Sequence, residues 1–550
     1  MEDRVRPLTS KEKKVIFASS AGTIFEWYDF YLYGSLSTVM AKNFFSNVNP
    51  TAAYIFALLA FAAGFAVRPF GAVVFGRLGD MVGRKFTFLI TILIMGLSTF
   101  LVGLLPNFHA IGFAAPILLV LLRLAQGLAL GGEYGGAAIF VGEHSPQGRR
   151  GLYTSWIQTT ATLGLLLSLV VIMFFRSLLG KSDFELYGWR FPFLFSFFLL
   201  AGSVWLRLQL QESPAFRQMK AAGRASTAPI AEAFGKWKNL KIVLLSLFGA
   251  TAGQAAIWYA SQFYALFFLT ETLKVDQADA NLLIAGALIL GAPFFVVFGW
   301  LSDRVGRKPI ILAGCLLAAL LYMPIFKALT AAANPALARA QASAPVTVIA
   351  DPSECSFQFA PIANTKFVTS CDLAKNFLAS AAVNYSNKAA PPGTTARIVI
   401  GGKEVAAFDG AKLSRDQFAT KRAAFEKEAS AAIAGAGYPL RADPSQINKP
   451  KVLGLLFVLM LLATMVYGPI AAQLVELFPT RIRYTSVSLP YHIGNGWFGG
   501  FLPPLVFAMV AARGNIYFGL WYPIGVAVMT FVVSLLFIPE TKDRNIYAHD

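Results

Sequence analysis

A ten-residue stretch of this chain occurs twice, as Gly76–Lys85 (GRLGDMVGRK) and again as Gly299–Lys308 (GWLSDRVGRK). Seven of the ten positions are identical, and both copies lie between long apolar runs. Glu143 and Glu476 open a second pair of related stretches, each with Pro, Arg, Tyr, Thr and Ser close behind. Internal similarity of this kind is typical of two halves built on one plan. The offset grows from 223 residues in the first pair to 333 in the second, so the second half carries about 110 extra residues.

The composition is that of a polytopic membrane protein. Hydrophobic residues make up 56% of the 550 residues and charged residues only 14%, and the mean hydropathy is +0.59. The net charge of +18 would suit a nucleic-acid partner, but the basic residues gather in short loops between apolar runs, so we exclude nucleic acid. The first apolar segment carries Glu26 and Asp29 and lacks a small-residue cleavage site. We therefore expect it to remain as the first span and not to act as a signal peptide.

Apolar windows of about 20 residues predict twelve transmembrane helices. Lys and Arg concentrate in the connections after the even-numbered spans, which predicts that these connections and both termini are cytoplasmic. The predicted helices cover residues 15–40, 52–75, 86–105, 111–141, 152–176, 190–209, 241–270, 280–300, 309–329, 452–477, 485–512 and 517–538.

These spans predict an all-α membrane protein with two pseudo-symmetric six-helix bundles. Residues 1–209 form the first bundle, and residues 240–330 together with 451–550 form the second. The polar, basic residues 210–239 are expected to link them in the cytoplasm. Residues 331–450 contain the extra length, and the parity of the spans places them outside, as a small α/β periplasmic insert between helices 9 and 10.

The insert has the signs of a small folded domain, and an unstructured loop is the alternative. Residues 396–400 and 403–408 are typical of a β-hairpin closed by Gly401-Gly402. Ser414 is expected to cap a helix that runs to about Ile433.

The three cysteines fall in two settings. Cys355 and Cys371 both belong to the insert, and an oxidising periplasm would join them in a disulfide bond worth roughly 3 kcal/mol on the chain-entropy model. Two unpaired thiols are the alternative. Cys315 lies inside the ninth span and is expected to pack as a small apolar residue.

The repeated decapeptide suits a gate between helices. Its glycines allow close helix approach, and Asp80 can accept hydrogen bonds from the N-terminus of a neighbouring helix. Arg84 is a basic partner for a carboxylate such as Glu143. Such a cluster can hold the cytoplasmic side closed and release it when the helices part; a solvated charge run is the alternative. The predicted gating residues are Asp80, Arg84, Glu143, Asp303, Arg307 and Glu476.

The repeat, the Glu212-Ser213-Pro214 ending of the first half and the Pro539-Glu540-Thr541-Lys542 ending of the second resemble the major facilitator superfamily. The stretches Phe25–Gly34, Gly64–Pro69, Gln126–Gly136 and Glu476–Pro490 resemble, more narrowly, its metabolite:proton symporter family. That resemblance covers the chain apart from the insert, which departs from the usual pattern. It implies a proton-coupled carrier of citrate, 2-oxoglutarate, shikimate, proline or betaine.

Charged side chains inside spans are functional candidates because burying one in hydrocarbon costs at least about 2.5 kcal/mol. Asp29, Glu26 and Glu133 are candidate proton carriers, with Arg123 as their fixed positive partner. The resemblance implies that such an arginine belongs to the coupling site. Glu133, flanked by glycine pairs, could instead bond the neighbouring backbone.

Polar and aromatic residues at helical spacing suggest a substrate site in both halves. Arg68 could bind a substrate carboxylate or extend to the membrane interface. His492 could relay protons or be a hydrogen-bonded core residue. The predicted substrate-binding residues are Arg68, Arg123, Tyr28, Gln126, Gln254, Trp258, Tyr259, Gln262, His492 and Asn495.

The function we expect is proton-coupled import of a small organic acid through a bacterial inner membrane, by a monomer. Aromatic residues such as Trp27 and Trp258 could cage a quaternary ammonium, so a proline or betaine symporter is the alternative. A sensor that uses the insert as its input is the alternative from another class, and so is an enzyme with its site in the insert. The insert contains no histidine, and no phosphate loop, dinucleotide fingerprint or zinc spacing occurs in the chain. We therefore expect no enzymatic activity, cofactor or metal.

Overall fold

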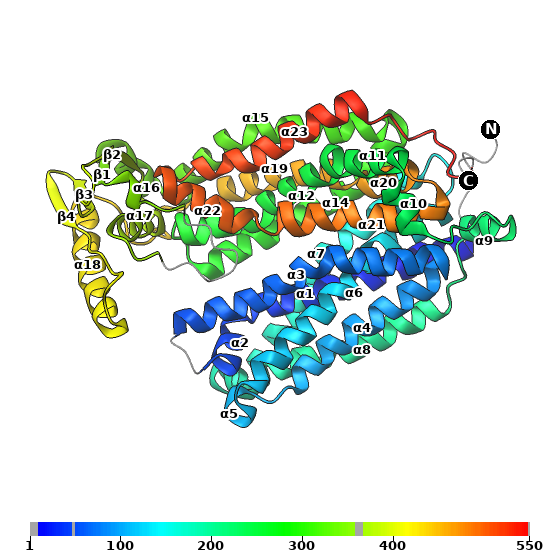
Figure 1. Cartoon of the computed structure of the whole chain (residues 1–550), viewed down its shortest axis with the longest axis horizontal. Helices are drawn as coiled ribbons and strands as arrows, with labels where there is room; N and C mark the ends of the chain where they lie inside the picture. Colours follow the sequence, from blue (N-terminus) through cyan, green and yellow to red (C-terminus); the bar gives the residue numbers. More distant parts are fainter. Residues whose placement is uncertain (1–8, 47–49, 358–366, 548–550) are drawn as a thin grey trace.

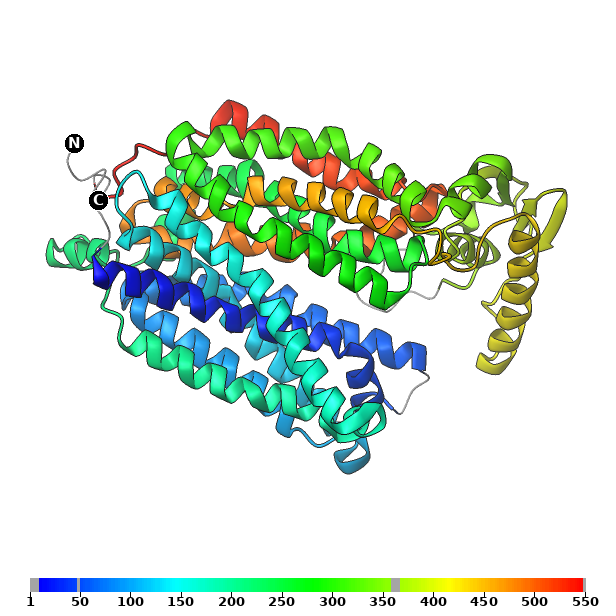
Figure 2. The ribbon, with the colours of Figure 1, turned by 180° about the vertical axis from the view of Figure 1, so that it is seen from behind.

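The computed structural model describes residues 9–46, 50–357 and 367–547. Its helices form two groups that lie side by side, one from each half of the chain, and a small domain extends from the second group (Figures 1 and 2). The start of α1 (Ser10–Ser35) and the residues that follow α23 (Trp521–Phe537) lie together at one end of the bundle, which we call the termini end. The small domain occupies the opposite end, the insert end.

The first group, the N-half, is built around α6, which packs against α3 and α4, while α1 packs against α7 and α8. The π-helical turn η2 continues α7. Besides α1, the elements of the N-half are α2 (Ser37–Phe44), α3 (Pro50–Met81), α4 (Arg84–Leu104), α5 (Phe108–Ile111), α6 (Ala114–His144), α7 (Arg150–Asp183), η2 (Phe184–Gly188) and α8 (Arg190–Leu208). Two short helices follow, α9 (Pro214–Ala221) and α10 (Pro229–Gly235).

The second group, the C-half, contains π-helical turns in two of its long helices. The segment Trp237–Thr272 comprises α11 (Trp237–Ser246), η3 (Leu247–Thr251), α12 (Ala252–Tyr259), η4 (Ala260–Tyr264), α13 (Ala265–Phe267) and η5 (Phe268–Thr272). The segment Thr480–Arg513 comprises η7 (Thr480–Ile482), α21 (Arg483–Ile493), η8 (Gly494–Gly499) and α22 (Leu502–Arg513). The other elements are α14 (Gln277–Val305), α15 (Arg307–Ala333), α19 (Lys449–Tyr467), α20 (Ile470–Leu477) and η9 (Phe518–Leu520).

Among the described residues, ten helical segments are long and apolar enough to cross a membrane. They correspond to the predicted spans 3 to 12. The first two predicted spans are the helices α1 and α3, of 26 and 32 residues, which are not among these ten but pack within the N-half.

Two pairs of helices make the most extensive contacts between the two halves. α7 of the N-half packs against α14 of the C-half, and α3 of the N-half packs against α21. These pairs correspond under the internal repeat, because α3 and α14 each end in a copy of the decapeptide. The shared plan therefore extends from the sequence to the interface between the halves.

The insert folds around a four-stranded sheet with the strand order β2-β1-β3-β4. β1 is parallel to β2 and antiparallel to β3, and the predicted hairpin is confirmed as the antiparallel pair β3–β4 around Gly401-Gly402. Ser414 caps α18 as predicted, and its hydroxyl accepts from the Gln417 N–H. The elements are α16 (Pro335–Ser343), β1 (Val346–Ala350), η6 (Pro352–Glu354), α17 (Ser370–Ser380), β2 (Tyr385–Ala389), β3 (Arg397–Ile400), β4 (Lys403–Ala406) and α18 (Arg415–Gly435).

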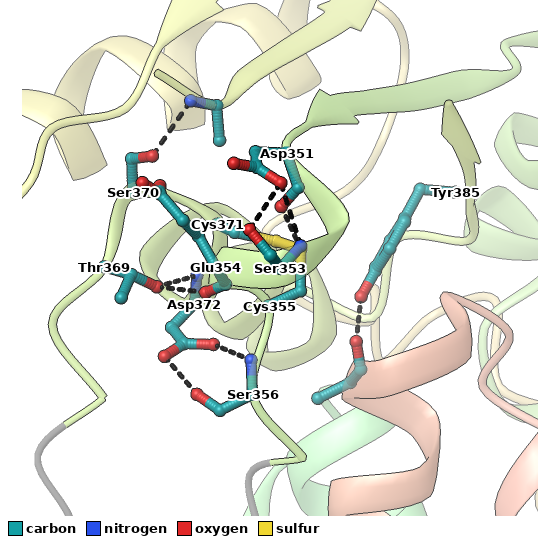
Figure 3. Close-up of a disulfide and its surroundings, with 12 residues drawn as sticks. Asp351, Ser353, Glu354, Cys355, Ser356, Thr369, Ser370, Cys371, Asp372 and Tyr385 are labelled. Atoms are coloured by element: carbon teal, nitrogen blue, oxygen red, sulfur yellow. Dashed lines mark hydrogen bonds between the residues drawn. A yellow bond between two sulfur atoms is a disulfide. The ribbon is translucent and has the colours of Figure 1, made fainter. Parts of the chain in front are cut away.

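The predicted disulfide between Cys355 and Cys371 is present in the insert (Figure 3). It joins the residue that follows η6 to the first turn of α17. Beside it, Asp372 accepts hydrogen bonds from the backbone and side chain of Ser356. Cys315, as predicted, is a buried free cysteine in α15.

Hydrogen bonds anchor the insert on the C-half. The Tyr385 hydroxyl donates to the Ala511 carbonyl, and the Tyr385 N–H donates to the Gly514 carbonyl at 2.6 Å. Farther along the insert, the Ala442 N–H donates to the Lys274 carbonyl at 3.0 Å. Burial raises the pKa of the Tyr385 hydroxyl above its usual range, so this group remains a donor.

Candidate functional site

Three of the predicted site residues meet inside the N-half. Arg123 on α6 donates to the Gln126 Oε1 at 2.6 Å and lies 3.8 Å from a carboxylate oxygen of Asp29 on α1. The Gln126 amide donates to the other Asp29 oxygen at 3.2 Å and to the Thr99 hydroxyl at 2.8 Å. Asp29 is 1% exposed and Arg123 5% exposed. The Gln126 amide group thus bridges the buried Asp29 carboxylate and the buried Arg123 guanidinium.

Arg68 and His492 bring the second half to this cluster. Arg68 on α3 interacts electrostatically with Asp29 and Arg123, and also with His492 on α21 of the C-half. Its guanidinium packs 4.3 Å from the centre of the Phe65 ring. Arg68 is 8% exposed and therefore buried within the protein. His492 is 1% exposed, and neither ring nitrogen has a hydrogen-bond partner among the described residues.

Aromatic rings from α1, the helix that carries Asp29, contact the C-half. Trp27 of α1 lies 5.2 Å from Trp258 of α12, measured between ring centroids. Tyr31 of α1 stacks on Phe263 of η4 at 5.9 Å. The Trp258 indole N–H is buried without a hydrogen-bond partner among the described residues, which leaves a buried donor of the bundle unused.

The polar stripe predicted on the seventh span is divided by a π-helical turn. Gln254 pairs with Asn495 through two amide contacts of 3.2 and 3.4 Å. Gln262 instead directs its amide to the Met460 sulfur at 3.6 Å. The spacing of three and four residues assumes a regular helix, and η4 begins at Ala260, before Gln262. Tyr259 is buried and packs on Trp258 and Phe263.

Two of the predicted residues face other partners within the N-half. The Tyr28 hydroxyl donates to the Pro192 carbonyl at 2.7 Å, and its ring packs with residues of α8. Glu133 forms an ion pair with Arg207 of α8 and accepts a hydrogen bond from the Thr91 hydroxyl at 2.9 Å. Glu133 thus shares α6 with Arg123 but is paired with Arg207 instead. The side chain of Glu26 lies outside the described residues.

Sequence reasoning missed a group of tyrosines that joins the halves. The ring of Tyr134 on α6 stacks on Tyr491 of α21 with 3.5 Å between centroids. The Tyr491 and Tyr467 hydroxyls are 2.5 Å apart, and Gln158 donates to the Tyr134 hydroxyl at 2.7 Å. Tyr134 stands between two glycine pairs, and that close-packing pattern was the available signal.

The predicted gating residues come together at the termini end in two equivalent networks. Asp80, at the end of α3, accepts the N–H groups of Tyr484 and Thr485 at 3.1 and 2.9 Å, and so caps α21 of the other half. In the second copy, Asp303 accepts the N–H groups of Gly151 and Leu152, both at 2.8 Å, and so caps α7.

A glutamate lies at the centre of each network. Glu143 of the N-half pairs with Arg483 of the C-half at 2.5 Å and with Arg84 at 3.8 Å. Its hydrogen-bond partner Ser213 belongs to the Glu-Ser-Pro motif. All three ionised groups are buried, so each depends on the others for compensation of its charge.

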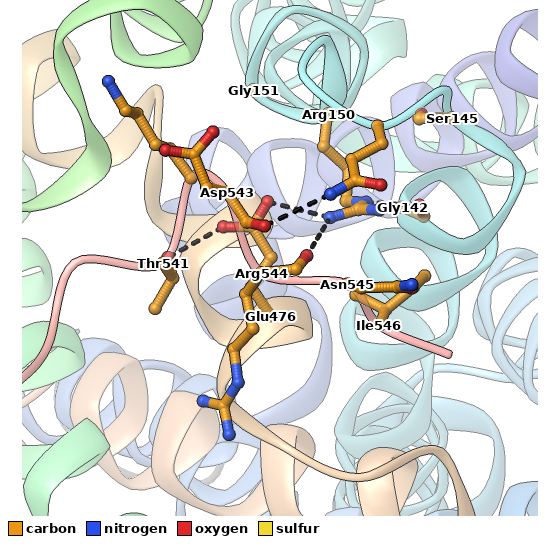
Figure 4. Close-up of polar contacts among 12 residues, drawn as sticks. Gly142, Ser145, Arg150, Gly151, Glu476, Thr541, Asp543, Arg544, Asn545 and Ile546 are labelled. Atoms are coloured by element: carbon orange, nitrogen blue, oxygen red, sulfur yellow. Dashed lines mark hydrogen bonds and ion pairs between the residues drawn. The ribbon is translucent and has the colours of Figure 1, made fainter. Parts of the chain in front are cut away.

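The second network repeats this arrangement with the halves exchanged (Figure 4). Glu476 of the C-half pairs with Arg150 of the N-half at 3.0 Å and with Arg307 at 3.1 Å. It accepts from Thr541, in the Pro-Glu-Thr-Lys motif, at 2.7 Å. Both networks cross from one half to the other, so the termini end is closed by ion pairs and helix caps.

Comparisons with known proteins identify the family. Residues 20–350 match the Major Facilitator Superfamily, and residues 429–550 match the family described as "Sugar (and other) transporter". The first match covers more than half of the chain. The chain belongs to the Major Facilitator Superfamily, and it is a transporter and not an enzyme.

Several curated relatives carry small metabolites, according to their names. The shikimate transporter of Escherichia coli K12 is 36% identical over 330 residues, which cover 58% of this chain and 74% of that protein. The alpha-ketoglutarate permease of the same strain is 34% identical over 334 residues, covering 60% and 75%. Its proline/betaine transporter is 34% identical over 345 residues, covering 59% and 68%.

A solved structure agrees in fold. The proton:xylose symporter XylE bound to 6-bromo-6-deoxy-D-glucose superimposes with a TM-score of 0.60 and 16% sequence identity, and the match covers 98% of both chains. At that identity the likeness concerns the arrangement of the helices alone.

Proposed function

We propose that this protein imports a small organic acid together with protons by alternating access. The observation that carries the proposal is the buried Asp29–Gln126–Arg123 cluster, with Arg68 and His492 beside it. The cluster combines a proton-accepting carboxylate with arginines that can bind a substrate carboxylate. The names of two relatives, the shikimate transporter and the alpha-ketoglutarate permease, support an organic acid as cargo.

The proposed topology has twelve spans, with α1 and α3 as the first two. The N-half bundle covers residues 1–209, the linker 210–239, and the C-half bundle 240–330 and 451–550. We place the termini end in the cytoplasm and the insert, residues 331–450, in the periplasm of a bacterial inner membrane. The basic loops of the termini end and the disulfide of the insert support this orientation. A relative 34% identical is named as an inner membrane metabolite transport protein of Escherichia coli K12.

Coupling follows from competition for Arg123. Without substrate, Asp29 faces the arginine and stays ionised. A substrate carboxylate that binds Arg123 takes this partner away, so Asp29 can accept a proton. Each ligand then promotes binding of the other, as linkage requires. Glu133, which is paired with Arg207, is the second choice for the carrier.

Uptake into proteoliposomes tests the proposal. We expect accumulation of a radiolabelled organic acid, such as shikimate or 2-oxoglutarate, under an inward proton gradient. A protonophore should abolish it, and a sodium gradient alone should not support it. Accumulation driven by sodium in the absence of a proton gradient would contradict proton symport.

Asp29→Asn tests the carrier. The variant should lose gradient-driven accumulation but retain exchange of labelled for unlabelled substrate, because exchange does not require the empty carrier to release its proton and return. The matched control is Gln126→Asn, since this substitution alters the cluster without removing the carboxylate. Normal accumulation by Asp29→Asn would place the carrier elsewhere.

A zwitterion is the second candidate substrate class, and the aromatic contact between the halves favours it. Trp27 and Tyr31 come from α1, the helix that carries Asp29, and Trp27 packs on Trp258; aromatic faces bind quaternary ammonium groups. The proline/betaine relative supports this alternative. A thermal-shift screen of carboxylates, shikimate, proline and betaine distinguishes the two classes. Stabilisation by betaine and not by any carboxylate would favour the zwitterion.

A further inference from the structure

The last described residues of the chain, Asp543 to Tyr547, run across the seam between the two halves at the termini end (Figure 4). They follow the Pro-Glu-Thr-Lys motif, which already belongs to the Glu476 network. We call this five-residue segment the strap.

Three hydrogen bonds attach the strap to the N-half. The Gln147 amide donates to the Asp543 carbonyl at 3.2 Å, and Arg150 donates to the Arg544 carbonyl at 3.5 Å. The Tyr547 hydroxyl donates to the carbonyl of Glu143 at 3.3 Å. Two of these N-half residues, Arg150 and Glu143, also take part in the networks that close the termini end.

Three further hydrogen bonds attach the strap to the C-half. Arg544 donates to the Leu477 carbonyl at 3.3 Å. The Ile546 carbonyl accepts from Arg483 at 3.1 Å and from Thr480 at 3.3 Å. The Ile546 side chain is 1% exposed, so an apolar anchor holds the strap where it meets η7 and α21.

We infer that the strap is an intramolecular latch that holds the closed state of the termini end. Opening this end moves the N-half away from the C-half, and the strap cannot follow both. One of its two sets of hydrogen bonds must therefore break in every transport cycle. The inference rests on the proposed alternating access, and it assigns to the strap a control over how often the cytoplasmic side opens.

Most of the hydrogen bonds of the strap have one of its backbone carbonyls as the acceptor. Gating arginines on both halves, Arg150 and Arg483, each donate to one of these carbonyls while they also bind a glutamate. Release of the strap removes an acceptor from both arginines at once. Side-chain substitutions in the strap leave these carbonyls in place, so removal of the segment is the stronger test.

The experiment uses a reporter cysteine at Val475, which is 0% exposed and packs against Gly142 of the other half. Maleimide labels Val475→Cys only when the halves part. Cys315, also 0% exposed but inside the C-half, serves as an internal reporter of unfolding. Purified full-length protein in detergent is compared with a truncation that lacks residues 543–550. The matched control lacks only 548–550 and keeps the strap.

When the halves part, one set of three hydrogen bonds between the strap and a half must break, and the 543–550 truncation removes this cost of opening. We therefore expect the Val475→Cys thiol to label at least about fivefold faster in this truncation than in the full chain. The 548–550 truncation should label at the full-length rate, and Cys315 should stay unlabelled in all three. Equal rates for the full chain and the longer truncation would overturn the latch. So would a shorter truncation that labels as fast as the longer one.

A point variant keeps the test decisive if the longer truncation exposes Cys315 and so reports unfolding. Ile546→Asp places a charge at the buried anchor and should accelerate labelling, whereas Ile546→Val should not. Equal rates for these two variants would overturn the inference. Labelling requires neither substrate nor a proton gradient, so failure of the uptake test and failure of the latch are separate results.

Discussion

The two copies of the decapeptide make the same contacts but are packed differently. At the Asp80 seam, the Tyr484 ring fits so closely against Gly79 that an added Cβ would collide with the ring. At the Asp303 seam, Gly151 occupies the place of Tyr484, and Ser302 occupies the place of Gly79. At the Asp80 seam the larger residue, Tyr484, belongs to the capped helix and the glycine to the decapeptide, whereas at the Asp303 seam the glycine belongs to the capped helix and the larger residue, Ser302, to the decapeptide. One of the three differences between the decapeptides, Gly79 against Ser302, therefore has a packing explanation.

The exchange makes the two seams chemically unequal. The Tyr484 hydroxyl reaches across to donate to the Gly132 carbonyl at 2.7 Å, so the Asp80 seam is closed by a buried ring as well as by ions. The Ser302 hydroxyl instead accepts from Arg307 at 3.0 Å, within its own half. Both decapeptides retain a glycine with positive φ before the Arg-Lys pair, Gly83 and Gly306, because the turn between the helices requires it. We expect the Asp80 seam to be the stronger closure.

Asp80→Asn should have the largest effect. It removes the charge that faces Arg84 at 3.1 Å in a fully buried site, and breaking such a pair costs about 3–5 kcal/mol. We expect uptake to fall at least about tenfold, while substrate binding in detergent stays near wild type because the central cluster is remote. Asp303→Asn, at a less buried carboxylate, should have a smaller effect in the same direction. Equal loss of binding affinity would indicate misfolding, and a larger effect of Asp303→Asn would reverse the proposed order.

Gly79→Ser should come next, because overpacking of a filled site costs about 1–3 kcal/mol. The serine Cβ would meet the Tyr484 ring, so the melting temperature and uptake should both fall. Adding Tyr484→Gly reproduces the pairing of the Asp303 seam, so the loss in the double variant should be smaller than the sum of the two single losses. A double variant no better than the sum of the two single variants would show that the size exchange is not what packs this seam.

Ser302→Gly should cost less, because it deletes a hydroxyl without creating a clash. The lost contact with Arg307 and the greater freedom of glycine in a helix together amount to about 1–2 kcal/mol. Thermal unfolding should show a small decrease, and uptake should remain measurable. Ser302→Ala is the matched control for the hydroxyl alone. A decrease larger than that of Gly79→Ser would contradict the ranking.

Tyr484→Phe should have the smallest effect. It removes only the hydrogen bond to the Gly132 carbonyl and keeps the ring in its slot, a loss of about 1 kcal/mol. The decrease in uptake should be smaller than the decrease caused by Gly79→Ser. The melting temperature gives the same comparison independently of activity, and an unchanged value would mean that the hydroxyl does not contribute to closure.

Local patterns predicted the parts of the molecule that depend on neighbouring residues. The Gly401-Gly402 hairpin and the Ser414 cap follow from turn and capping chemistry, and the repeat indicated that Asp80 could meet a helix N-terminus. The disulfide was predicted from two cysteines in one segment that the span parity places outside.

Features that depend on the packing of distant helices could not be read in this way. Glu133 shares a helical stripe with Arg123, yet its partner Arg207 comes from another helix that no spacing on α6 reveals. Gln262 and Gln254 contact different partners, and the π-helical turn that begins at Ala260 changes the spacing that a regular helix would give; no residue pattern in the segment predicts this turn. The exchange of Tyr484 and Gly151 depends on contacts across the interface between the halves, which the repeat alone does not contain.

The most direct test of the account is a reversible cross-link between the halves at the termini end. Gly142 of the N-half and Val475 of the C-half are suited to it, because a Cβ at Gly142 would lie 3.4 Å from the Val475 Cβ, close to the separation in disulfides. Oxidation of Gly142→Cys/Val475→Cys should abolish proton-driven uptake and preserve substrate binding, and reduction should restore uptake. Either single-cysteine variant, treated alike, should transport throughout. Full uptake by the completely cross-linked protein would contradict the claim that this end must open for transport.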